Sequence, residues 1–168
     1  MKPKVEKSGI QEQKNTLNIP LTRPYFDEEE IEELKEVLDS GWVSQGPKTK
    51  EFEDAFAKYV GAKYAVAVTN CTAALHLSLL GIGIEKGDEV LVADFTHPAT
   101  GHAVLYCGAK PVFIDVDPKT YNIDPGLIEE KITEKTKAII PVHTFGQPAD
   151  MDPIMEIASD YGLRVIED

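Results

Sequence analysis

The sequence predicts an α/β protein in which a mostly parallel sheet carries helices on both faces. Short runs rich in Val, Ile and Ala recur along the chain and are apolar on both sides, as in strands that are covered from both faces. These runs span residues 64–68, 89–93, 111–115, 137–142 and 163–167. Helix-like segments separate them, and strands that alternate with helices are typical of parallel sheets.

Two helices are expected before the first strand. In "FDEEEIEELKEVLDSG", Asp27 is a suitable N-cap, Glu30 follows three residues later, and Gly41 comes directly after the apolar stripe. This is the pattern of a helix with a capping box and a glycine stop. A second apolar stripe runs through "KEFEDAFAKYVG" and ends at Gly61. The loop between the two helices, "GWVSQGPK", holds Trp42, the only tryptophan.

Further helices are expected between the strands, in "TAALHLSLL", "PATGHAVLY", "DPGLIEEKI" and "DPIMEIASDY". Pro98, Pro125 and Pro153 lie at or near the first turns of three of them, where a missing backbone N–H costs no hydrogen bond. Asp124 and Asp152 precede two of these prolines and are the expected N-caps. Strands and helices therefore alternate along the whole second part of the chain.

Composition narrows the classes of function. The 168 residues are 42% hydrophobic and 27% charged, and the net charge is -12 from 29 acidic and 17 basic residues. This acidic balance argues against general binding to nucleic acid or to an anionic membrane. No apolar run is long enough to cross a bilayer, and the polar first 16 residues lack the apolar centre of a signal peptide. Cys71 and Cys107 make no disulfide framework, so we expect a cytoplasmic protein.

Polar, aromatic and small residues collect directly after the predicted strands, where the sequence reads "TNCTAA", "DFTHPAT", "VDP", "HTFGQPAD" and finally Asp168. In open parallel sheets, ligands bind outside the carboxyl ends of the strands. We therefore expect a ligand site at this edge. Glu167 and Asp168 are adjacent on a strand and point to opposite faces, so only one carboxylate is expected in the site, and Asp168 is the one beyond the strand.

The candidate residues at this edge have local alternatives. The helix start in "TNCTAALH" suits a phosphate, but Asn70 or Thr72 also fits as an ordinary N-cap. His97 is placed either to stack on a flat ring or to serve its own loop, and His143 either to bind a ligand or to bond its own loop. The glycines of "GIGIEKGDEV" follow a helix and precede a strand, which is the wrong order for a dinucleotide fingerprint.

Five segments together resemble the DegT/DnrJ/EryC1/StrS family of sugar aminotransferases. They read "SGWVSQGPKTKEFEDAFAKYVGAKYAVAVTNCTAALHLSL", "GDEVLVADFTHPAT", "GAKPVFIDVDPKTYNIDP", "KAIIPVHTFGQPADMDPI" and "GLRVIED", in family order from about Leu17 to Asp168. The resemblance implies the large domain of the type I aminotransferase fold, pyridoxal 5'-phosphate as cofactor, and a homodimer. It also implies a nucleotide-linked keto sugar as substrate, with glutamate as the amino donor.

The resemblance also implies roles for single residues. Cys71, Thr72 and Ala73 correspond to the helix start that receives the cofactor phosphate, with Cys71 in place of a frequent glycine. His97 corresponds to the ring stacked on the pyridine, where Phe, Tyr or Trp is commoner in the family. Asp168 corresponds to the catalytic carboxylate that pairs with the pyridine nitrogen. No metal ligand is implied.

The family's Schiff-base lysine lies beyond "VIED", so it is not in this chain. We therefore expect an amino-terminal fragment that does not transaminate alone. Its expected organisation is a disordered leader over 1–16, amino-terminal helices with a substrate-side loop over 17–60, and a partial cofactor-binding large domain over 61–168. The fragment would lack the sheet's remaining strands and the small domain.

Other functions stay open at the level of sequence. The same fold and cofactor serve sugar dehydratases, in which histidine replaces the lysine. A doubly wound binding or phosphotransfer domain would instead use Asp94, Asp115 and Asp168 around a magnesium ion. A non-catalytic regulator is disfavoured by the acidic charge. Trp42 and Gln45 are candidates to approach the substrate, with packing as the alternative role for Trp42.

Overall fold

The computed structural model describes residue 20 and residues 22–168. The leader predicted over 1–16 lies outside these residues. The chain divides into two compact units, the first ending at Lys63 and the second spanning Tyr64–Asp168. Within the described residues, no helix combines the length and the apolar character that crossing a membrane requires.

The first unit contains the two predicted helices, α1 (Glu28–Ser40) and α2 (Pro47–Val60). The capping box is confirmed, because the Asp27 carboxylate accepts the Glu29 amide at 2.9 Å and the Glu30 carboxylate accepts the Asp27 amide at 2.7 Å. Gly41 ends α1 in the left-handed conformation at φ 71°, which a side chain with a Cβ atom would disfavour. The sequence signals therefore define these helices locally.

The second unit is built on a four-stranded sheet with the order β2-β1-β3-β4. Its strands are β1 (Glu89–Ala93), β2 (Lys110–Ile114), β3 (Thr136–Ile140) and β4 (Arg164–Val165). All three strand pairs are parallel, which confirms the predicted parallel sheet. All five residues of β1 are buried, as expected for a central strand.

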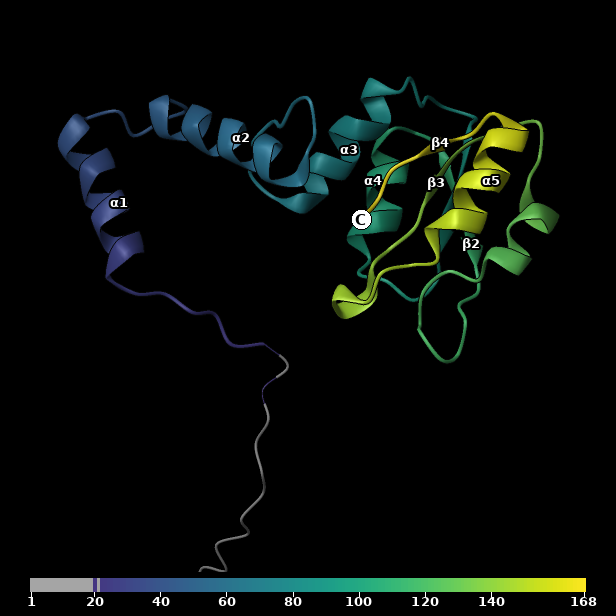
Figure 1. Ribbon diagram of the computed structural model, residues 1–168. Coiled ribbons are helices and arrows are strands. Elements are labelled where there is room, and N and C mark those ends of the chain that lie inside the picture. The colour runs from purple at the N-terminus through teal and green to yellow at the C-terminus, as the bar shows by residue number, and fades with distance from the viewer. Residues whose placement is uncertain (1–19, 21) are drawn as a thin grey trace, which may run out of the picture. The chain divides into compact units, whose positions relative to one another are not determined.

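Helices cover both faces of this sheet, as predicted (Figure 1). Side chains alternate along β1, so Val90 and Val92 pack on one face while Leu91 packs on the other. The first face carries α3 (Cys71–Gly81) and α4 (Ala99–Tyr106). The second face carries α5 (Met151–Tyr161). The two layers of apolar side chains form the core of this unit.

Three local predictions were wrong. Residues 64–68 are not a strand of the sheet, and Val66 is 77% exposed, because β propensity reflects packing and burial more than composition. Residues 125–131 form two 3₁₀ turns, Pro125–Leu127 and Glu129–Lys131, instead of a helix. There the Asp124 carboxylate accepts the Gly126 amide at 2.9 Å, which favours a turn. The N-cap of α5 is Asp150, not Asp152.

Candidate functional site

A hollow of about 380 Å³ lies at the carboxyl edge of the sheet. The chain leaves β1 toward β2 on one side and leaves β3 toward β4 on the other, so the hollow lies where the connections diverge and where such sheets bind ligands. It is lined by segments that follow β1, β3 and β4, namely by Phe95, Thr96, His97, Val142, His143, Thr144, Phe145 and Asp168. The structure thus brings His97 and Asp168, both predicted from the sequence, to one cavity.

Asp168 is held at this cavity by its backbone and by its carboxylate. Its amide donates to the Pro141 carbonyl and its carbonyl accepts from the His143 amide, both at 2.9 Å. One carboxylate oxygen, Oδ2, accepts the Thr100 hydroxyl at 2.6 Å, and Oδ1 accepts the Cys71 thiol at 3.5 Å. Among the described residues, no lysine or arginine forms an ion pair with this carboxylate. The two side-chain donors to this carboxylate, a hydroxyl and a thiol, are therefore neutral groups.

Cys71, Thr72 and Ala73 form the first turn of α3, as the sequence suggested. Asn70 is the N-cap, and its side-chain oxygen accepts the Ala73 amide at 2.9 Å, so the capping alternative is realised here. Partial burial, followed by the charge and the hydrogen bond of Asp168, raises the pKa of the Cys71 thiol. Cys71 is thus a hydrogen-bond donor at neutral pH and not a thiolate nucleophile.

His97 is exposed at the entrance of α4, where its Nδ1 accepts the Ala99 amide at 3.2 Å. A nitrogen that accepts a hydrogen bond carries no proton, so this arrangement holds the proton of a neutral ring on Nε2. The backbone bond fixes the ring at the mouth of the cavity. His97 therefore serves its own loop in this structure and also lines the cavity.

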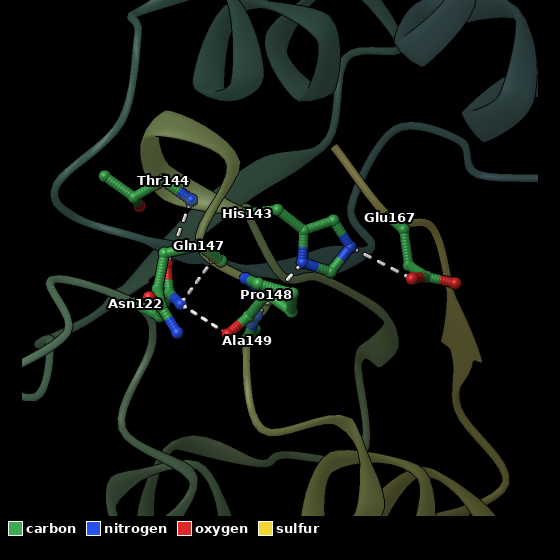
Figure 2. A network of polar contacts seen from close by, with 7 residues as sticks. All are labelled: Asn122, His143, Thr144, Gln147, Pro148, Ala149 and Glu167. Atoms are coloured by element: carbon green, nitrogen blue, oxygen red, sulfur yellow. Dashed lines mark hydrogen bonds and ion pairs between the residues drawn. The ribbon is translucent and has the colours of Figure 1, made fainter.

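His143 joins the loop after β3 to the end of the chain after β4 (Figure 2). Its Nδ1 accepts the Ala149 amide at 3.1 Å, and its Nε2 lies 3.0 Å from a carboxylate oxygen of Glu167. Nε2 is thus the donor in the pair with Glu167. Glu167 and Asp168 follow β4 and have different partners, His143 and Thr100.

Asn122 holds the loop that lines the far wall of the cavity, and sequence reasoning missed it. Its amide nitrogen donates to the carbonyls of Gln147 and Pro148, both at 2.9 Å, and its oxygen accepts the Thr144 amide at 3.0 Å (Figure 2). The loop presents Phe145, 80% exposed, with a left-handed backbone at φ 53°. Such a backbone is costly for an aromatic residue, so the Asn122 bonds stabilise it.

Sequence reasoning also missed two threonines, Thr96, which lines the cavity, and Thr100, which is buried behind it. They are four residues apart in "DFTHPAT", across the start of α4. Thr96 precedes the N-cap Pro98 and Thr100 lies in the first turn of the helix, so two hydroxyl residues on either side of a helix start were the available signal. Thr100 bonds to Asp168, which is distant in sequence, and Thr96 bonds to Thr100, so no local pattern reveals the link to Asp168.

Trp42 and Gln45 lie in the first unit, where they bond to each other: the indole N–H donates to the Gln45 carbonyl at 2.8 Å. A Cβ atom on Gly46 would overlap the Trp42 ring, so glycine is required at that position. The tryptophan therefore packs on its own loop, beside a hollow of about 300 Å³ within this unit. Residues of α1, α2 and the loop between them line that hollow, and no strand of the described residues contributes to it.

The arrangement proposed for magnesium, with Asp94 and Asp115 beside Asp168, does not occur. Within the part of the chain that the structure describes, no three His, Cys, Asp or Glu side chains are grouped closely enough to hold a metal ion. The cavity at Asp168 instead combines a carboxylate with aromatic and imidazole rings, and the first turn of α3 contacts it only through the bond of Cys71 to Asp168. These are the elements of a site for an organic ligand.

The chain is similar to known proteins over most of its length. The spore coat polysaccharide biosynthesis protein SpsC of Bacillus subtilis is 49% identical over 156 residues, which are 93% of this chain and 40% of the relative. GDP-perosamine synthase of Caulobacter vibrioides is 48% identical over 151 residues, 89% of this chain and 41% of the relative. The crystal structure of NtdA from Bacillus subtilis with bound cofactor PMP is 41% identical and superimposes with a TM-score of 0.81, covering 83% of this chain and 32% of that one.

The chain spans about 40% of the length of the curated relatives it matches. The sequence profile of the DegT/DnrJ/EryC1/StrS aminotransferase family matches residues 24–168. The match includes both the amino-terminal helices and the whole sheet unit with its cavity. The chain therefore belongs to the DegT/DnrJ/EryC1/StrS aminotransferase family.

Proposed function

We propose that this chain is the cofactor-binding part of an aminotransferase that uses pyridoxal 5'-phosphate to transfer an amino group, from glutamate, to a nucleotide-linked keto sugar. One observation carries the proposal: the Asp168 carboxylate lines the cavity at the sheet edge, bonded only to neutral donors among the described residues. An anion without a cationic side chain as partner suits a ligand that presents a protonated ring nitrogen.

The residues present fit this cofactor. Asp168 would accept the pyridine N–H and so hold a proton on that nitrogen. A protonated pyridine ring supplies an electron sink when the substrate's Cα–H bond breaks. His97, fixed through Nδ1 at the mouth of the cavity, would lie against the ring.

The start of α3 suits the phosphate. Backbone N–H groups at a helix start and the Thr72 hydroxyl are donors for an anion, and the helix dipole favours negative charge there. The thiol of Cys71, in the same turn, contacts Asp168, so this turn lies beside the carboxylate. Cys71, Thr72 and Ala73 would thus bind the phosphate end, and Asp168 the ring nitrogen.

We further propose that the activity belongs to a longer protein that contributes the Schiff-base lysine and works as a homodimer in the cytoplasm. The greater length of the relatives supports the first part. Both cysteines are free, which suits a reducing compartment. The PMP in NtdA and the GDP-linked product in the name of the Caulobacter relative support the cofactor and the substrate class.

The test uses the full-length product of the gene. Its absorption is titrated with pyridoxal phosphate, and amino transfer from glutamate to nucleotide-linked keto sugars is followed by mass spectrometry. Replacing Asp168 by Asn keeps the shape but removes the charge, so we expect cofactor binding to persist and the barrier to rise by about 3 kcal/mol. The exposed Asp160 on α5, changed to Asn, is the matched control.

Two results would contradict the proposal. Near-normal turnover in Asp168→Asn would contradict the role proposed for Asp168 as the partner of the pyridine nitrogen. Loss of water from the sugar without any need for glutamate would instead identify a dehydratase.

A further inference from the structure

Three side chains form a continuous chain of hydrogen bonds behind the cavity. The Thr96 hydroxyl lies 2.9 Å from the Thr100 hydroxyl, and the Thr100 hydroxyl lies 2.6 Å from Oδ2 of Asp168. Thr100 is fully buried in the first turn of α4, whereas Thr96 is half-buried and lines the cavity. The chain thus runs from the cavity wall through the protein interior to the carboxylate.

The direction of these bonds follows from the chemistry of the groups. An ionised carboxylate only accepts hydrogen bonds, so the single proton of the Thr100 hydroxyl is directed to Asp168. The oxygen of Thr100 then has only lone pairs left, and Thr96 must be the donor in the other bond. Each donor polarises the next in such a chain, which strengthens the bond to the carboxylate.

The two oxygens of Asp168 are held unequally. At 2.6 Å the buried hydroxyl of Thr100 makes a short, charge-assisted bond to Oδ2. The thiol of Cys71 is a weak donor and lies 3.5 Å from Oδ1. A ligand N–H therefore displaces or joins the weak bond on Oδ1 at much lower cost than the strong bond on Oδ2.

The helix start that carries Thr100 also holds the ring of His97. The Thr100 amide donates to the His97 carbonyl at 3.1 Å, and the neighbouring Ala99 amide donates to His97 Nδ1 at 3.2 Å. The same turn thus orients a ring at the cavity mouth and a carboxylate at the back. A substitution of Thr100 therefore affects both the His97 ring and the Asp168 carboxylate.

We propose that Thr100, backed by Thr96, is a positioning residue that binds Oδ2 of Asp168 and thereby presents Oδ1 to the pyridine nitrogen of the cofactor. This rests on the proposed function. Thr100 touches neither cofactor nor substrate, and it acts by fixing the rotation of the carboxylate. Without its hydroxyl, the carboxylate can turn away from the ring nitrogen, and the ring loses its proton more easily.

The experiment compares Thr100→Val with Thr100→Ser in the full-length protein. Valine keeps the branched shape without the hydroxyl, and serine keeps the hydroxyl. We measure the ¹⁵N chemical shift of pyridoxal phosphate labelled at the ring nitrogen, the cofactor Kd, and kcat and KM separately. For Val we expect a shift toward the deprotonated nitrogen and a fall in kcat of about 10- to 100-fold, as for other hydrogen-bond partners of a ligating group, with KM little changed. Thr100→Ser should keep the ¹⁵N shift and kcat near their wild-type values.

Thr136→Val is the matched control, because Thr136 also has a buried hydroxyl, 5% exposed, which accepts the Thr133 amide at 2.9 Å. It lies at the amino end of β3, opposite the cavity. We expect a similar loss of stability in this variant, but a wild-type ¹⁵N shift. Thr96→Val leaves Thr100 in place and should change the ¹⁵N shift in the same direction by a smaller amount. This variant tests the inference even if Thr100→Val fails to fold.

A wild-type ¹⁵N shift and kcat in Thr100→Val would overturn the inference while leaving the proposed function intact. The same holds if Thr100→Ser is as impaired as Thr100→Val, because the hydroxyl would then not be the cause. An unchanged shift in Thr96→Val would overturn the backing role of Thr96. Failure of the wild-type protein to bind pyridoxal phosphate would overturn the proposed function and this inference together.

Discussion

Helices α1 and α5 look alike in sequence but differ in what stabilises them. Both carry an apolar stripe and both end at a glycine in the left-handed conformation. In α5, Ile154 and Ile157 are buried against the sheet, whereas no residue of α1 is buried and Leu34 is 66% exposed. The comparison teaches that capping and periodicity define a helix locally, while most stabilisation comes from the surface it packs against.

The largest expected effect comes from truncating the same kind of side chain in the two units. Ile139, fully buried in β3, changed to Ala should lower the free energy of unfolding by about 4 kcal/mol, because transfer and cavity costs add. Leu34 in α1 changed to Ala should cost less than about 0.5 kcal/mol. Urea denaturation of the full-length protein measures both. Equal costs would show that the α1 stripe is covered in solution.

The second effect concerns the loop on the wall of the cavity. Asn122 is 2% exposed and makes three hydrogen bonds to the loop. Changing it to Leu leaves the buried Thr144 amide and the carbonyls of Gln147 and Pro148 without these partners, so we expect a loss of about 3 kcal/mol in stability and faster hydrogen exchange of the Thr144 amide. Asn122→Asp keeps the acceptor for Thr144 and should protect that amide better. If the Thr144 amide exchanges at the wild-type rate in Asn122→Leu, the loop does not depend on Asn122 for its conformation.

A smaller effect is expected at the cap of α1. Replacing Asp27 by Ala removes the bond to the Glu29 amide and should destabilise this helix by about 1 kcal/mol. Hydrogen exchange should accelerate at the amides of the first turn but not in β3. The exposed Asp39, near the other end of α1, is the control. A change that spreads into β3 would contradict the separation between local capping and sheet packing.

The smallest effect is a pH dependence in the sheet unit. The hydrogen bond from Thr133, followed by that from Lys110, lowers the pKa of Glu89 below its ordinary value of 4.5. The unfolded chain then binds more protons, so this stabilisation is present above pH 4.5 and is lost as the pH falls through the lowered pKa. Glu89→Gln should therefore be less stable than wild type at pH 7, and the gap should narrow at pH 3. A gap of constant size in urea midpoints would exclude this contribution.

Much of the site was predictable because parallel strands bring their carboxyl ends to one edge. This rule placed His97 and Asp168 at one cavity before any distance was known. It could not indicate that Thr100 bonds to Asp168, or that His143 pairs with Glu167, because these partners are 68 and 24 residues apart. Such contacts depend on the packing of α4 and on the pairing of β4 with β3, which no local pattern encodes.

Most helices and the central strands follow from local sequence, because caps, apolar periods and glycine stops act within a few residues. Asp27, Glu30 and Gly41 define α1 without help from the rest of the chain. Tertiary packing instead determines that residues 64–68 stay outside the sheet, that residues 125–131 form turns, and which donors hold Asp168. The physical reason is that a strand, a buried hydroxyl and a paired carboxylate each require a partner from a distant part of the chain, and only packing brings that partner into place.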